Sequence, residues 1–262
     1  MLQQGFGIYA LAVPMLLLAL LALAETAWPR RPLVLGRFRR WRTHGLFFIA
    51  NLAVARLLSL VVAVSAAALW AEQYRFGLLY LTEWHWLAEA SLAFVLLDFA
   101  VWLQHWAMHR FSVLWRMHAV HHSDRDLDVT TALRFHPFEL VVSTLYKSAI
   151  VGLLGVPLLV ALAFELWLNA NALFNHSNIR LPARMDRLIR FLLVTPDMHG
   201  VHHSVRADDQ RHNYGFAMSL WDRLLRTYRI QSPSGPKHAI GLSDVQDERP
   251  ACVVWSLKQP LT

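Results

Sequence analysis

The chain has 262 residues, of which 56% are hydrophobic, and its 25 Lys and Arg outnumber its 18 Asp and Glu. This composition favours a single membrane-embedded domain that spans residues 1–262, and not two soluble domains. The arginines gather beside apolar segments, which argues against a nucleic-acid-binding face. Cys252 is the only cysteine, which excludes an intrachain disulfide, a CxxC redox pair and a thiolate metal cage. Any metal site must therefore use nitrogen or oxygen ligands.

The N-terminal part, residues 1–86, contains two apolar runs. The first, Ile8 to Leu23, precedes a basic loop that the positive-inside rule places in the cytoplasm. Ala22–Ala24 resembles a signal-peptide cleavage site, but Met1–Gly7 hold no Lys or Arg, so we expect a retained first span. The second run, Gly45 to Trp70, is long enough to cross and precedes an outward loop with Arg75 as its basic residue. The arginines of the basic loop are Arg30, Arg31, Arg37, Arg39, Arg40 and Arg42.

The predicted core, residues 87–230, begins with a third run, Leu87 to Met108, that returns the chain to the cytoplasm. A fourth block, Phe138 to Phe174, is interrupted by Gly152, Gly155 and Pro157, which favours a two-helix hairpin. Residues 231–262 form a polar C-terminal tail. The expected fold is an all-α integral membrane protein with about three spanning helices, a helical hairpin and a cytoplasmic histidine-rich helical cap.

Most of the 14 histidines fall into tight groups. His105 and His109 are spaced i, i+4 at the end of the third run, so their rings share one helical face. Two His-x-x-His-His triplets follow, and we expect the three rings of each to share a face as well. Thr195-Pro196-Asp197 before the second triplet is typical of a helix start. His176 returns to the same side through the hairpin. The triplets are His118, His121 and His122, and His199, His202 and His203.

Nine imidazoles exceed the ligand number of one zinc or one octahedral metal, so two metals are the simpler interpretation. Imidazole suits iron, zinc, copper and nickel alike, and ligand type alone does not choose among them. Lone histidines, such as His44, His85 and His238, are expected to have interfacial or surface roles instead of binding metal.

These motifs resemble the fatty acid hydroxylase superfamily, which includes sterol desaturases, sphingolipid and fatty acid hydroxylases and alkylglycerol monooxygenases. The resemblance runs from about Asp98 to Tyr228, and Arg226 stands where a glycine is common in Gly-Thr-Tyr. The matching segments are Asp98 with the His105/His109 pair, Leu114–Ser123, Arg134–Glu139, Asn175–Asn178, Thr195–His199 onward, Asn213–Gly215 and Trp221–Leu224.

The resemblance implies a non-haem centre of two Fe ions that uses O2 to hydroxylate or desaturate a fatty acyl, sterol or related lipid drawn from the membrane. Zinc on purification is compatible with such ligands, because zinc binds them more tightly than ferrous iron. The chain has no GxGxxG fingerprint, cysteine set or evident haem domain, so electrons must come from a separate donor, ferredoxin or cytochrome b5-like. The metal site would face the cytoplasm, and a bacterial inner membrane fits this arrangement.

Four residues are candidates for hydrogen bonds to the ligands: Asp98, His136, Glu139 and Asn213. Asp98 precedes His105 by seven residues, which places both on one helical face. For Asp98, a role at the metal site and a role in hydrogen bonding between helices are given equal weight. His136 is either a tenth ligand or a group that supports the ligands from behind, and we rank the second role slightly higher. Glu165 and Asn169 form a stripe with His176 that either lines a substrate cavity or bonds between helices, and we favour the second for Asn169.

Two other classes compete with the oxygenase. A membrane metal-binding or metal-transport protein would place its ligands along a path through the spans, whereas these histidines collect at one face. A zinc hydrolase needs one metal, an open position and a general base, and nine imidazoles argue against it.

Overall fold

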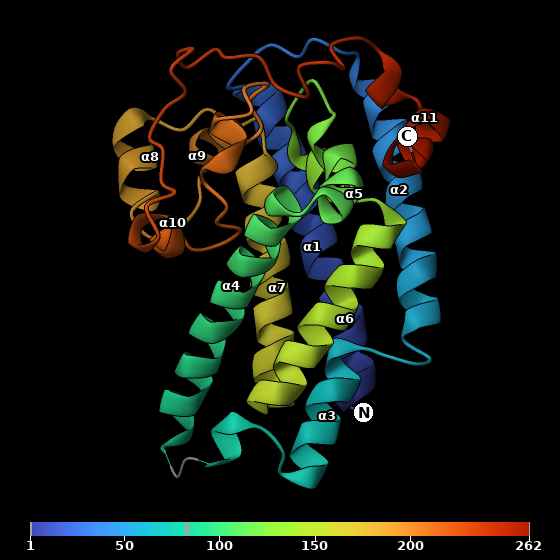
Figure 1. Cartoon of the computed structure of the whole chain (residues 1–262), viewed down its shortest axis with the longest axis vertical. Helices are drawn as coiled ribbons and strands as arrows, with labels where there is room; N and C mark the ends of the chain where they lie inside the picture. Colours follow the sequence, from blue (N-terminus) through green and yellow to red (C-terminus); the bar gives the residue numbers. More distant parts are fainter. Residues whose placement is uncertain (1, 82–83, 262) are drawn as a thin grey trace.

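The computed structural model describes residues 2–81 and 84–261, with side chains from Ala12 onward, and in this part of the chain it contains no β-strand. Long helices run side by side through the body of the molecule, and most of the short ones gather at one end (Figure 1). The α-helices are α1 Leu2–Ala27, α2 Arg37–Leu58, α3 Val64–Tyr74, α4 Trp86–Arg110, α5 Ser112–His122, α6 Pro137–Leu154, α7 Leu158–His176, α8 Ala183–Ile189, α9 Pro196–His202, α10 Leu220–Leu224 and α11 Val253–Lys258.

Among the described residues, three helices are long and apolar enough to cross a membrane: α4, α6 and α7. A shorter apolar stretch, Ala12–Ala27, belongs to α1. Large apolar side chains on α1 and α2 remain exposed, among them Leu23 at 69% and Ile49 at 61%, as expected for surfaces that contact lipid tails. The prediction of an all-helical chain with membrane-spanning helices is confirmed.

The expected hairpin is present as α6 and α7. Gly155 ends α6 in the left-handed conformation with φ 72°, and Pro157 precedes α7. A Cβ atom at Gly155 would lie 2.6 Å from the carbonyl oxygen of Phe76, so only glycine lets this turn approach the segment after α3. The turn lies at the end of the bundle away from the histidines.

The second apolar run differs from its prediction, because Gly45 to Trp70 is not one helix. α2 ends at Leu58, and the chain turns before α3 starts at Val64. Ala68 of α3 is fully buried against Val151 and Ala161 of the hairpin. Small side chains allow this close packing, and tertiary contact rather than hydrophobic length therefore sets where the run breaks.

The basic loop also differs from its prediction. Arg37, Arg39, Arg40 and Arg42 lie in the first turns of α2, and Arg40 is buried. Its guanidinium pairs with Asp124 at 2.7 Å and with Asp128, in the segment that follows α5. Burial alone would raise the pKa of Asp124, but Arg40 and the hydrogen bond to His44 hold it well below its ordinary value. The network fastens α2 to the segment that carries the first histidine triplet.

Of the three isolated histidines, His85 is exposed and caps α4, as expected, whereas the surface prediction was wrong for the other two. His44 is buried and contacts Thr130 Oγ1 at 2.8 Å and Asp124 at 3.0 Å. His238 is buried and donates from Nε2 to the carbonyl oxygen of Gly200 at 2.6 Å. Both pair with partners far away in sequence, which periodicity does not reveal.

The C-terminal residues fold back on the histidine end. Leu242 and Val245 pack on Ala119 of α5, with Trp115 and Trp255 at the edge of the cluster. In the last part of the family-like region, the closing segment 213–228, Arg226 adopts a left-handed φ of 61°, which explains why a glycine suits this position in related sequences.

Candidate metal centre

The structure brings the nine predicted histidines together from four helices at one end of the bundle. The last turns of α4 hold His105 and His109, and α5 ends with the first triplet and α7 with His176. α9 holds His199 and His202, and His203 is the residue that caps its end. The predicted start of α9 is confirmed: Thr195 caps the helix by accepting a hydrogen bond from the Met198 backbone, and Pro196 is its first residue. All four helices therefore end in ligand-type side chains.

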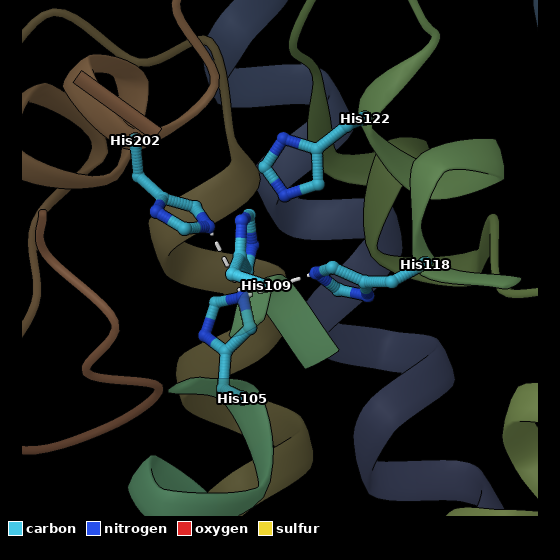
Figure 2. Close-up of side chains that lie close together, drawn as sticks. All are labelled: His105, His109, His118, His122 and His202. Atoms are coloured by element: carbon cyan, nitrogen blue, oxygen red, sulfur yellow. Dashed lines mark hydrogen bonds between the residues drawn. The ribbon is translucent and has the colours of Figure 1, made fainter. Parts of the chain in front are cut away.

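The nine rings form two groups, and in each the potential ligand atoms lie within 4.8 Å of one another. Figure 2 shows the rings of the five-histidine group converging from α4, α5 and α9. The groups touch, since the rings of His122 and His203 stack with centroids 4.2 Å apart. The five-histidine group contains His105, His109, His118, His122 and His202, and the four-histidine group contains His121, His176, His199 and His203.

The two triplets do not point as predicted, because each divides between the groups. His118 and His122, spaced i, i+4, join the five-histidine group, while His121 turns to the other. In α9 the i, i+4 pair His199 and His203 joins the four-histidine group, and His202 crosses over. Neighbouring residues on a helix point about 100° apart at 3.6 residues per turn, so one triplet can serve two sites.

Hydrogen bonds behind the rings show which nitrogen faces the group. His105 Nδ1 lies 2.7 Å from the carbonyl oxygen of Tyr214, and His202 Nδ1 lies 2.8 Å from that of His212. A carbonyl oxygen only accepts, so each Nδ1 carries the proton and each neutral ring has a lone pair on Nε2. His118 Nδ1 likewise donates to Glu139 Oε1 at 2.8 Å.

These lone pairs face one another. The Nε2 atom of His105 lies 3.0 Å from that of His202 and 3.1 Å from that of His118. Burial lowers the pKa of His202 to about 3, so its ring is neutral near pH 7. Neutral imidazoles with lone pairs in contact repel unless a cation lies between them. The donor set therefore fits a transition-metal ion that prefers imidazole.

The four-histidine group fits a metal for the same reason. His176 Nδ1 lies 2.7 Å from the Ala172 carbonyl oxygen, and its Nε2 lies 3.0 Å from that of His121 and 3.0 Å from that of His199. Burial, together with neighbouring histidines, lowers the pKa of His121, His199 and His203 well below the ordinary value. All three rings are neutral near pH 7, as metal ligation requires.

The four candidates for supporting roles lie in different places. Glu139 contacts the cluster through His118, and Asp98 instead accepts a hydrogen bond from Trp221 at 2.8 Å. His136 lies in neither group and caps α6, where its Nδ1 accepts from the Phe138 backbone. Asn213 donates to the Met198 carbonyl oxygen at 2.9 Å, which ties α9 to the closing segment. Asp98 and Asn213 thus form hydrogen bonds that hold elements in place, with partners other than the nine rings.

Sequence reasoning missed the backbone acceptors at Tyr214 and His212, because a carbonyl group carries no side-chain signature. It also missed how the Tyr214 carbonyl is held. The buried Asp222 carboxylate accepts from the backbone nitrogens of Tyr214 at 2.9 Å and Gly215 at 2.7 Å, and from Trp102 at 3.0 Å. One signal in the sequence could have pointed to this arrangement: the resemblance of two segments to the last part of the family pattern. These segments are Asn213–Gly215 and Trp221–Leu224.

Glu139→Gln is expected to weaken metal binding about 10- to 100-fold while the fold persists, because the amide orients His118 less firmly and no longer raises its basicity. A competition titration with a chelator of known affinity measures this change. Glu248→Gln is the matched control, since Glu248 pairs with Arg39 at the surface. Equal metal affinity in the two variants would contradict the role given to Glu139.

A cavity of about 190 Å³ adjoins the five-histidine group. His105 and His118 form part of its wall, and α2, α4, α6 and α7 supply most of the remainder. Its other lining residues include Asn51, Gln104, Met108, Phe135, Glu139, Ser143, Lys147, Leu168, Asn169 and Phe216. Asn169 lines this cavity, whereas the favoured interpretation was a hydrogen bond between helices. Its amide donates to the Glu165 carbonyl oxygen at 2.7 Å, within the same helix α7.

A family model described as fatty acid hydroxylase matches residues 90–227. Ornithine lipid hydroxylase OlsE of Rhizobium tropici is 33% identical over 154 residues, which are 56% of this chain and 43% of that protein. Alkylglycerol monooxygenase of Homo sapiens is 26% identical over 167 residues, 62% of this chain and 34% of that protein. The match thus spans less than half the length of these relatives. No solved structure matches the chain significantly.

Proposed function

Since this chain belongs to the fatty acid hydroxylase family, we propose that it is a membrane-bound oxidoreductase that hydroxylates or desaturates a lipid with O2. The observation that carries the proposal is the pair of adjoining histidine groups beside a cavity. The similar proteins named for lipid hydroxylation and alkylglycerol oxidation support a lipid substrate. Two iron ions, when bound by the five- and four-histidine groups, would supply the activation of dioxygen.

The residues of this chain orient the histidine rings and form the walls around the substrate. Carbonyl oxygens and Glu139 hold the Nδ1 protons of His105, His202 and His118, which keeps the Nε2 lone pairs of these three rings directed to where an ion would bind. Apolar walls such as Met108, Phe135 and Leu168 exclude water around a carbon chain in the cavity. We propose that the substrate enters sideways from the bilayer between the spanning helices, and that the histidine end faces the cytoplasm.

Metal content and lipid oxidation test the proposal together. Membranes with the intact protein should yield about two metals per chain and a lipid that gains oxygen or loses two hydrogens. His121→Ala removes a ligand of the four-histidine group alone, so it should yield about one metal and no oxidised lipid. Zinc found after purification would not contradict native iron, since zinc competes for imidazole ligands. One metal or none, with unchanged lipids under adequate iron and reductant, would favour metal binding or transport instead.

We further propose that electrons come from a separate ferredoxin or cytochrome b5-like donor. Trp115 supports an entry point, because its ring lies 4.9 Å from that of His109 and 5.5 Å from that of His122. The same side chain lines a surface groove with Arg116 and Arg249. Arg249 is already paired with Asp247, whereas the exposed Arg116 complements an acidic face, which is a common means of steering association.

Trp115→Leu is expected to slow lipid oxidation when a protein donor supplies the electrons, and to leave it unchanged with a small diffusible reductant. The aromatic ring bridges the groove and the ligands, whereas a small reductant does not depend on the groove. Turnover assays with the two reductants in parallel measure the difference, and Trp86→Leu at the start of α4 is the control. Equal slowing with both reductants would show that Trp115 serves packing alone.

A further inference from the structure

The cavity beside the five-histidine group is lined by polar side chains along one face of α6. Glu139, Ser143 and Lys147 follow one another at intervals of four residues, so they lie in a row. Glu139 contacts His118, and the helical rise places Lys147 about 12 Å further along the axis. The cavity thus has a histidine end and a lysine end.

At the lysine end, the ammonium of Lys147 pairs with Glu165 of α7. Its Nζ lies 2.8 Å from Oε1 and 2.9 Å from Oε2, and the two side chains are 21% and 29% exposed. An ionisable pair within apolar spanning helices is costly and points to a function. An ammonium has three protons, and Glu165 takes two, so one donor is left for a ligand.

Two further polar atoms on the cavity residues lack partners. Asn51 Oδ1 and Glu139 Oε2 are buried and accept no hydrogen bond from the described residues. A buried acceptor without a donor is costly, so both atoms call for a donor from a ligand or water. A ligand that both accepts a hydrogen bond from Lys147 and donates one to the wall matches these requirements.

The charges indicate which ligands fit. Glu165 already neutralises Lys147, and the Glu139 carboxylate adds a negative charge at the wall. A carboxylate or phosphate in the cavity would meet Glu139 and would have to separate the Lys147–Glu165 pair. An uncharged hydroxyl or amide can accept a hydrogen bond from the third N–H of Lys147 and leave the pair intact.

We propose that the cavity selects lipids whose enclosed segment carries an uncharged hydrogen-bonding group, a hydroxyl or an amide, held by Lys147 at the end away from the histidines. The cavity is smaller than typical ligand pockets, so only a segment of the lipid enters and the remainder lies in the bilayer. The oxidised carbon would lie at the opposite, histidine end of the enclosed segment, and this part of the inference rests on the proposed function. The binding preference itself does not.

Three probes of equal chain length test the preference: hexadecanol, hexadecanoate and hexadecane. Binding to the full-length, zinc-loaded protein in lipid nanodiscs is measured by competition with a fluorescent long-chain alcohol, without turnover. Hexadecanol is expected to bind about tenfold more tightly than the other two, which is the effect of roughly one added hydrogen bond. Equal affinity for hexadecanol and hexadecane, or tighter binding of hexadecanoate, would overturn the proposal.

The double variant Lys147→Met with Glu165→Leu removes both charges without leaving either unpaired, so it preserves the folded helix pair. It is expected to bind hexadecanol and hexadecane equally, whereas Lys258→Met, on an exposed lysine of the C-terminal helix, retains the tenfold preference. A preference that survives in the double variant would refute the assignment to Lys147. If the preference holds but no lipid is oxidised under adequate iron and reductant, the proposed function fails and the cavity assignment stands.

Discussion

His202→Ala and His203→Ala are each expected to leave about one metal per chain, although the two residues are adjacent. His202 belongs to the five-histidine group and His203 to the four-histidine group, so each substitution damages a different site. Loss of a residue that merely orients a ligand already lowers affinity about 10- to 100-fold, and loss of the ligand itself should exceed that. Lipid oxidation should fall more than about 100-fold in both variants, because the proposed reaction uses both ions.

Elemental analysis after equilibration with limiting metal, together with circular dichroism, measures the first effect. His85→Ala is the control, because His85 is exposed at the start of α4 and should retain about two metals. Two metals in both variants would contradict the division into two groups. If both variants lost all metal while they retained native helicity, the two groups would form one inseparable site.

Arg40→Leu is expected to destabilise the protein by about 3–5 kcal/mol, which is typical when one partner is removed from a buried ion pair. The Arg40 side chain is 1% exposed and pairs with Asp124 and Asp128, which are also buried. Leucine would leave these carboxylates without their cation, next to the helix that holds the first triplet. We therefore expect lower metal occupancy as well as a lower midpoint of thermal unfolding.

The neighbouring Arg39 provides a matched control. It pairs with Glu248, but both side chains are more than 60% exposed, at 64% and 69%. Exposed pairs contribute about 0–1 kcal/mol, so Arg39→Leu should scarcely change the unfolding midpoint in detergent or nanodiscs. Similar unfolding midpoints for the two variants would show that the buried network does not fasten α2 to the histidine end.

Several features of the site follow from local sequence. The spacing of His105 and His109, the cap at Thr195 and the breakers around Gly155 depend on helical geometry within a few residues. Local rules of this kind hold wherever the segment lies in the fold, and the structure confirms all three. The same rules failed for Gly45 to Trp70, where packing of α3 on the hairpin breaks a run that hydrophobicity alone would continue.

Burial of charged and polar residues could not be predicted from such rules. Arg40 belonged to a basic run, and His44 and His238 were isolated, yet all three are buried against partners far along the chain. A buried polar group needs a specific partner, and no short pattern shows which distant residue supplies it. The Lys147–Glu165 pair is a further example, since its members lie on different helices of the hairpin.

The sequence by itself determined which histidines form the cluster, because repeated ligand-type residues at helix ends are visible as a pattern. Tertiary structure alone decided how these histidines divide. His121 and His122 are neighbours in the chain, but their rings leave the helix in different directions and meet different partners from α7, α4 and α9. A helix fixes the angle between its own side chains, whereas only the packing of helices against one another decides which site each side chain enters.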